Sequence, residues 1–198
     1  MNVQSAIDRK LAQHQSKGTA LELDHEEVVA LRSLLDPADH RAYPTHPTGL
    51  EDTQAALDWL LARVPDGTPV VTAGFSMGSS MARQMCLGPQ AARVKGWISF
   101  SLACDAYKFM GAAGKAIKDF TDEAFAALAE RDDLEMCWIN GTRDPMSPVD
   151  SVKKYAAAMK RAPDLHFVEG KKHHFDDAEQ MRACATHAAD WLQGKFLS

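Results

Sequence analysis

A serine, an aspartate and a histidine follow one another along the chain in an order that suits nucleophilic catalysis. Ser76 lies between Gly74 and Gly78 in the pattern G-x-S-x-G. A serine hydroxyl is a weak nucleophile at neutral pH, and it needs a histidine to take its proton and a carboxylate to orient that histidine. Asp144 and His173 come later, in the order that such a site uses. These three residues are therefore the candidate catalytic set.

The segment around Ser76 predicts a sharp turn between a strand and a helix. The apolar, β-branched run that begins at Val70 favours a strand, and residues 79–86 permit a helix. Glycines on both sides of the serine leave no Cβ atoms where the strand and the helix crowd together. The backbone N–H of Met77, at the start of the helix, would point to where an oxyanion forms. Met77 is therefore the candidate oxyanion donor.

Both candidate partners of the serine follow predicted strands. A strand over Leu134–Asn140 leads into Asp144, and a strand over Leu165–Glu169 leads into the neighbours His173 and His174. In open α/β sheets, ligands bind outside the carboxyl ends of the strands. The strand ends are therefore expected to bring the serine, the aspartate and one of the two histidines together.

The rest of the chain alternates predicted strands and helices. This alternation implies parallel βαβ units, and so an α/β fold with a mostly parallel sheet and flanking helices. We expect a single domain over residues 1–198, in which a helical insert over residues 106–131 is either core or a small cap over the site. Further helices are expected over Ala6–Gln15, Leu50–Val64, Ser151–Arg161 and Ala178–Leu192, and a further strand over Val94–Leu102.

The segment before the first clear helix is less regular. Asp24–Leu35 fits a helix with Val28, Leu31 and Leu35 on one face, and its part Glu27–Leu31 would also serve as a short buried strand. The helix is favoured. Residues 36–48 hold three prolines and are expected to be a loop.

Composition excludes several classes of protein. The 198 residues carry a net charge of −5 with no basic run, which argues against a nucleic-acid partner. No stretch is apolar enough for a membrane span or a secretory leader. We therefore expect no membrane partner and a cytoplasmic location. The cysteines are too widely spaced for a zinc site or a disulfide framework and are expected to be buried thiols. No metal or cofactor is implied. The cysteines are Cys86, Cys104, Cys137 and Cys184.

These motifs resemble the α/β-hydrolase superfamily, and within it the dienelactone-hydrolase-like serine esterases. The resemblance covers roughly residues 50–192, including the helix before the serine. It implies a Ser76–His173–Asp144 triad that hydrolyses a small ester or thioester through an acyl-enzyme, without a cofactor. Ser79 stands where the family commonly has glycine. The matching motifs are Gly74-Phe75-Ser76-Met77-Gly78, Gly141-x-x-Asp144-x-x-x-Pro148 and Gly170-x-x-His173-x-Phe175.

The main departure from the family lies before Ser76. The family normally has several strands and a glycine-bearing oxyanion loop there, whereas the first 67 residues hold only Gly18, Gly49 and Gly67. The second oxyanion donor is therefore sought in the loop 36–48. One missing donor costs roughly 10²–10³ in rate, so weak activity is expected. The sheet edge left by absent strands would be covered by the N-terminal helices or by a second subunit in a homodimer.

Two alternatives stay open from the sequence. The register of Phe175 favours His173 as the base, whereas hydrolases with an aromatic residue directly after the histidine would favour His174. The rival function is a non-catalytic or very weakly active hydrolase-fold binding protein with a relic triad, and an acyltransferase or a truncated product with no stable fold are further readings. Substrate identity depends on pocket shape, which the motifs do not specify.

Overall fold

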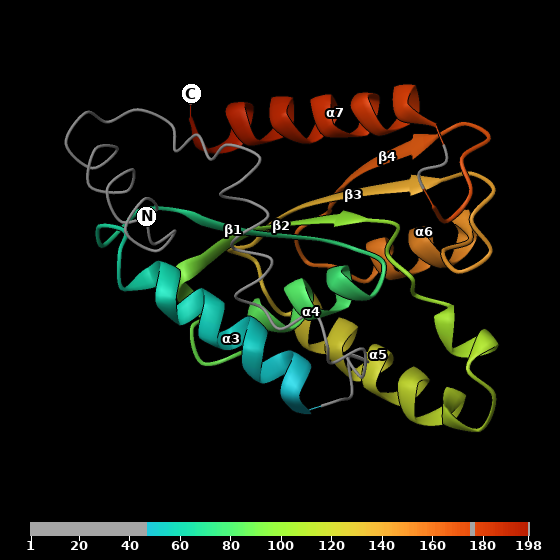
Figure 1. The fold of residues 1–198 in the computed structure, drawn as a ribbon, viewed down its shortest axis with the longest axis horizontal. Helices are drawn as coiled ribbons and strands as arrows, with labels where there is room; N and C mark the ends of the chain where they lie inside the picture. Colours follow the sequence, from blue (N-terminus) through green and yellow to red (C-terminus); the bar gives the residue numbers. More distant parts are fainter. Residues whose placement is uncertain (1–46, 175–176, 198) are drawn as a thin grey trace, which may run out of the picture.

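The computed structural model of the protein describes residues 47–174 and 177–197 (Figure 1). Their strands form one parallel sheet in which each strand lies beside the next one along the chain. This order arises when each strand returns through a helix on the same face, because such crossovers are right-handed. The strands are β1 (Val70–Phe75), β2 (Val94–Phe100), β3 (Glu135–Gly141) and β4 (Asp164–Val168).

Helices cover both faces of the sheet, as Figure 1 shows. The alternation of strands and helices confirms the predicted α/β fold. One face carries α3 (Pro47–Leu61), α4 (Met77–Met85), α5 (Gly114–Ala129) and α6 (Val149–Ala157), and the other carries α7 (Ala178–Phe196). Short 3₁₀ helices in the connections are η1 (Ala91–Arg93), η2 (Ala106–Phe109) and η3 (Gly111–Ala113).

The central strands are buried on both sides. Alternate residues of a strand point to opposite faces, so a sheet with helices on both faces needs apolar residues in both sets. Toward α5, the rings of Trp97 and Trp138 pack edge-on with centroids 5.6 Å apart, and Phe125 lies 5.8 Å from Trp138. Toward α7, Ile98 and Ile139 are buried. This two-sided burial explains why apolar residues stand at adjacent positions in β2 and β3, as in Trp97-Ile98 and Trp138-Ile139.

The helix before β1 begins earlier than predicted. α3 starts at Pro47, whereas the predicted helix starts at Leu50. A proline suits the first turn of a helix because the N–H that it lacks would have no intrahelical partner there. Residues 47 and 48 of the predicted loop 36–48 are therefore helical, and the remainder of that segment lies outside the described residues. The predictions for residues 6–15 and 24–35 lie outside the described residues.

Most of the apolar insert belongs to the core. Ile117, Phe125 and Leu128 are buried, because α5 turns these residues toward the sheet. Phe109, by contrast, is 55% exposed on η2. The role of the insert as a cap over the site stays a prediction.

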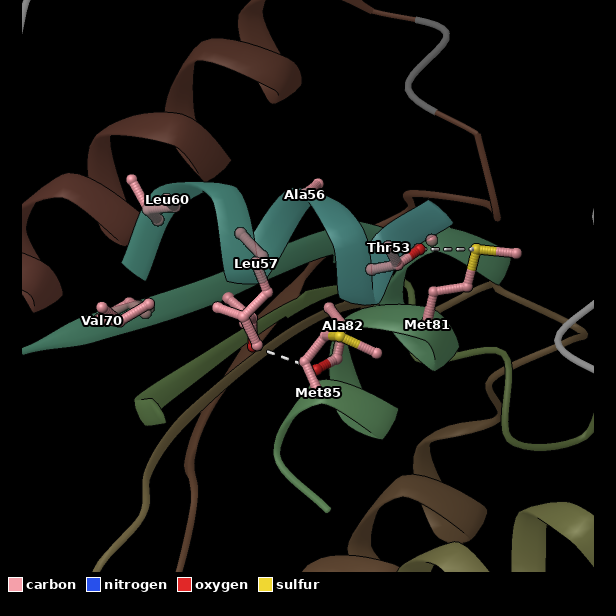
Figure 2. Close-up of a pocket in the computed structure, with 12 residues that line it drawn as sticks. Thr53, Ala56, Leu57, Leu60, Val70, Met81, Ala82 and Met85 are labelled. Carbon is pink, nitrogen blue, oxygen red and sulfur yellow. Dashed lines mark hydrogen bonds between the residues drawn. The ribbon is translucent and has the colours of Figure 1, made fainter. Parts of the chain in front are cut away.

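Within the described part of the chain, β1 has a strand neighbour on one side only. The N–H of Ser76 donates to the carbonyl of Phe100 in β2. Because successive residues of a strand direct their backbone N–H and C=O groups to opposite sides, those of Ala73 point away from β2. A groove of about 290 Å³ lies along this edge, between α3 and α4 (Figure 2). Its walls are mainly apolar and include Leu60 and Met81. The predicted cover for this edge, by the N-terminal helices or by a second subunit, stays a prediction.

The structure also bears on the cysteines and on membrane insertion. Cys86, Cys104, Cys137 and Cys184 are buried free thiols, as predicted. None of the helices in residues 47–174 and 177–197 is long and apolar enough to cross a membrane.

Candidate active site

Ser76 occupies a strained turn between β1 and α4. Its backbone has φ 53° and ψ −115°, a conformation that costs free energy for a residue with a Cβ and that persists only when the surroundings enforce it. The two flanking glycines contribute differently to this turn. A Cβ built on Gly74 would lie 2.2 Å from the carbonyl oxygen of Gly78, whereas a Cβ on Gly78 has no heavy atom within 4 Å. The crowding therefore requires glycine at position 74 alone.

We expect Gly74→Ala to destabilise the protein and Gly78→Ala to be tolerated. The new Cβ at position 74 would meet backbone, which cannot move without displacing α4, and overpacking of this kind costs about 1–3 kcal/mol or more. For a chain of this size that lowers the thermal midpoint by roughly 5–10 °C. Gly78→Ala should leave it within about 2 °C, since alanine favours a helix. Circular dichroism melts measure both, and equal midpoints would contradict the assignment of strain to Gly74.

The structure brings Ser76, His173 and Asp144 together. The Ser76 hydroxyl lies 2.7 Å from Nε2 of His173, and Nδ1 of His173 lies 3.0 Å and 2.9 Å from the two carboxylate oxygens of Asp144. The histidine is 6% exposed and the aspartate 3%. A neutral imidazole that donates from Nδ1 to the carboxylate leaves the Nε2 lone pair free to accept the serine proton. The arrangement can therefore move a proton away from Ser76.

The surroundings of Asp144 keep its carboxyl ionised. Burial by itself raises the pKa of Asp144, but the hydrogen bond and the charge of His173 lower it, as do the N–H of Met146 and the hydroxyl of Ser147. The net result is a pKa below the ordinary value, with the Met146 N–H 2.8 Å from Oδ1. The carboxylate is consequently charged at neutral pH and stabilises a protonated imidazole.

The two adjacent histidines have different environments. His173 is buried between the serine and the aspartate, whereas His174 is exposed. The centroids of their two rings lie 5.2 Å apart, with an angle of 83° between the ring planes. The ring centroid of Phe75 lies 5.5 Å from that of His173 and 5.9 Å from that of His174. The geometry thus favours His173 as the partner of Ser76. Phe175, whose position in the motif favoured His173 in the sequence, lies outside the described residues.

Residues 33–193 match the alpha/beta hydrolase domain family. The chain is an alpha/beta hydrolase. The match covers most of the sequence and agrees with the parallel sheet and its flanking helices. It confirms the resemblance to the superfamily that the motifs predicted. The chain matches no curated protein.

Solved structures with the same fold include three enzymes. A monoacylglycerol lipase from Paleococcus ferrophilus is 15% identical, with a TM-score of 0.57 over 72% of this chain and 74% of that one. A thermophilic esterase from Thermogutta terrifontis with bound propionate is 16% identical, with a TM-score of 0.57 over 78% and 67%. An esterase from Pyrococcus furiosus is 15% identical, with a TM-score of 0.54 over 74% and 62%. At these identities the likeness shows the fold alone. This chain covers between 60% and 74% of the lengths of solved structures that it matches.

The candidate oxyanion donor of the alpha/beta hydrolase lies at the first residue of α4. Within the described residues, no carbonyl accepts a hydrogen bond from the N–H of Met77. An N–H at a helix start favours negative charge, because the first amides of a helix have no intrahelical acceptor. The second donor was predicted in the loop 36–48, of which residues 36–46 lie outside the described residues. The expected weak activity therefore stays a prediction.

Sequence reasoning missed two polar residues beside the triad. Ser101, after β2, adopts φ 56° and donates its hydroxyl to the carbonyl of His173 at 2.9 Å. The ammonium of Lys171 lies 2.9 Å from that same hydroxyl. A lysine next to another lysine in a loop predicts a solvated side chain, and a serine after a strand has many uses. No signal in a single sequence would have singled out either residue.

In residues 47–174 and 177–197, no group of three or more His, Cys, Asp or Glu side chains lies close enough to hold a metal ion.

Proposed function

We propose that this alpha/beta hydrolase hydrolyses small carboxylic esters or thioesters through a Ser76–His173–Asp144 triad and an acyl-enzyme. The observation that carries the proposal is the 2.7 Å contact between the Ser76 hydroxyl and Nε2 of His173, whose other ring nitrogen is bonded to Asp144. Nucleophile, base and orienting carboxylate are then in hydrogen-bond reach of one another, as covalent acyl transfer requires.

Acylation begins when the Ser76 oxygen attacks the carbonyl carbon of the substrate. Nε2 of His173 takes the hydroxyl proton, and the carboxylate of Asp144 stabilises the imidazolium that forms. Negative charge develops on the substrate oxygen, which the N–H of Met77 would receive as a hydrogen-bond donor. Nε2 then gives its proton to the alcohol or thiol as the bond between carbonyl carbon and leaving group breaks. An ester of Ser76 remains.

Deacylation repeats these steps with water. His173 takes a proton from the water, the resulting hydroxide attacks the acyl carbon, and the same proton returns to the oxygen of Ser76 as the acid leaves. The enzyme ends in its starting protonation state. Both halves proceed without a change of oxidation state, and every proton taken up by His173 is returned.

Small acyl groups are proposed as substrates on two grounds. The Thermogutta terrifontis esterase of the same fold has a bound propionate, a short carboxylate of the kind that ester hydrolysis releases. In this chain, the side chain of Met77 is 38% exposed directly after the nucleophile, so an apolar surface borders the serine. Specificity within esters and thioesters depends on pocket shape and is tested with a series of acyl lengths.

A fluorophosphonate probe tests whether Ser76 is activated. The serine oxygen would attack phosphorus and displace fluoride, which leaves a phosphonyl group that mass spectrometry maps to the peptide containing Ser76. We expect labelling of the native protein and none after heat denaturation, since reactivity depends on the folded triad. Absence of labelling, or labelling at another serine, would contradict the proposed function and favour a binding protein with a relic triad.

A further inference from the structure

Lys171 lies two residues before His173, and its side chain is buried. The residue is 1% exposed. Its ammonium donates to the hydroxyl of Ser101 at 2.9 Å, to the carbonyl of Lys172 at 2.9 Å and to the carbonyl of His173 at 3.3 Å. A buried ammonium is costly unless hydrogen bonds satisfy it, so these acceptors hold the side chain in one place.

Ser101 connects this ammonium to the end of β2. Its hydroxyl accepts from Lys171 and donates to the carbonyl of His173 at 2.9 Å. Its backbone is fixed as well, because its N–H donates to the carbonyl of Ile139 on β3 at 2.8 Å. The carbonyl of His173 therefore receives hydrogen bonds from two directions, one from a hydroxyl and one from an ammonium.

The backbone of Lys171 contacts the loop that carries Asp144. The N–H of Arg143 donates to the Lys171 carbonyl at 3.0 Å. A Cβ on Gly141 would lie 2.1 Å from the same carbonyl oxygen, so only glycine allows the two loops to approach this closely. Through backbone and side chain together, one residue thus contacts the chain that follows β2, β3 and β4.

The charge of Lys171 also acts on the thiol of Cys184 in α7. Burial raises the pKa of the Cys184 thiol, and the positive charge of Lys171 acts against that rise. A thiol with a raised pKa is neutral at physiological pH. The lysine is buried, away from the solvent that a loop lysine usually reaches.

We propose that Lys171 is a positioning residue of the active site: with Ser101, its buried ammonium fixes the carbonyl of His173 and so aims the imidazole at Ser76 and Asp144. This inference rests on the proposed function. A ring whose backbone is held in this way keeps Nε2 2.7 Å from the serine oxygen. Misplacement of a reacting group by about 1 Å costs roughly 10²-fold in rate.

Lys171→Met and Lys172→Met form a matched pair. The first keeps the length of a buried side chain and removes its hydrogen bonds. We expect its kcat for p-nitrophenyl acetate to fall by roughly 10- to 100-fold with KM within about threefold, because the ring moves while the rest of the site is unchanged. The second alters an exposed side chain and keeps the carbonyl that Lys171 contacts. Its kcat should stay within about twofold.

Proton NMR gives a readout that does not depend on turnover. The ring proton between Nδ1 of His173 and Asp144 is recorded in the Ser76→Ala protein and assigned by its loss in a Ser76→Ala/His173→Gln double variant. Lys171→Met added to Ser76→Ala should shift or broaden this resonance, and Lys172→Met added to it should not. A resonance that is the same in both would overturn the proposal.

Ser101→Ala decides the question if Lys171→Met does not fold. It removes the hydroxyl that contacts both the ammonium and the His173 carbonyl, and we expect kcat to fall by roughly tenfold with KM little changed. Where Lys171→Met folds, the loss of kcat in the Lys171→Met/Ser101→Ala double variant should be smaller than the product of the two single fold-losses, because both residues act through one carbonyl. Unchanged kcat in Ser101→Ala, with an unmoved ring resonance, contradicts the positioning role.

Failure of the proposed function gives a different result. The wild-type protein would then neither hydrolyse p-nitrophenyl acetate nor react with the fluorophosphonate, whatever residue stands at position 171. The NMR comparison still tests how the ring is held in that case. A wild-type protein that is active and labelled, with equal kcat in Lys171→Met and Lys172→Met, overturns the positioning role alone.

Discussion

Ser76→Ala is expected to lower kcat for p-nitrophenyl acetate by about 10⁶-fold while the protein stays folded. Members of a triad act as a unit, so removal of the nucleophile removes nearly all that the base and its aspartate contribute. The methyl group of alanine fits wherever the serine Cβ already lies, and the strain of φ 53° at this position is the same for both residues. Steady-state hydrolysis measures the loss, and circular dichroism confirms the fold.

Ser80→Ala is the matched control for this experiment. Ser80 lies one turn further along α4 and its N–H bonds to the carbonyl of Ser76, a contact that the substitution leaves in place. We expect its kcat within about twofold of wild type. If Ser76→Ala hydrolysed the ester as fast as Ser80→Ala, the nucleophile would have to be sought elsewhere in the chain.

The parallel sheet could be predicted because its strands are buried on both faces. Such strands are short, continuous apolar runs between turn signals, and the observed β3, Glu135–Gly141, differs from the predicted range by one residue at each end. Parallel βαβ units were predicted without a strand order. The observed order agrees with consecutive units of one handedness, which place neighbouring strands side by side. The start of α3 was less predictable, because Pro47 fits a loop and a first helical turn equally well.

The proximity of Ser76, Asp144 and His173 could be predicted because each one follows a strand, and parallel strands end at the same edge. The sequence alone could not choose between His173 and His174, since adjacent loop residues point in different directions. The structure favours His173 through contacts with residues far away in the chain. Ser101, which donates to its carbonyl, lies 72 positions earlier. Contacts of this range follow from how the loops pack, which no local pattern describes.

The burial of Lys171 shows the same limit more strongly. Its type and its place in a loop predict a solvated ammonium. The structure instead buries it. Ser101, after β2, supplies a hydroxyl to its ammonium, and Gly141, the last residue of β3, leaves room for its carbonyl. Each of these residues is unremarkable by itself in sequence. Their joint effect depends on three loops meeting at one edge of the sheet.

His173→Gln is expected to lower kcat by about 10⁵- to 10⁶-fold, and His174→Gln by less than about threefold. Glutamine is close to histidine in size and polarity, but it cannot take a proton from the Ser76 hydroxyl, which in the structure lies 2.7 Å from Nε2 of His173. His174 is exposed, and its ring meets that of His173 edge-on at 83°. It can therefore be replaced without removing a contact between the base and the serine.

The same pair of variants should differ in reactivity toward the fluorophosphonate probe, which reports the first chemical step without product release. Labelling of Ser76 should be slowed in His173→Gln roughly as much as ester turnover, and should stay at the wild-type rate in His174→Gln. Thermal melts of both proteins control for folding, since His173 is buried and His174 is not. Turnover that is lost in His174→Gln and kept in His173→Gln would assign the base to the exposed ring. The loop would then have to change conformation when substrate binds, so that the ring of His174 replaces that of His173 beside Ser76.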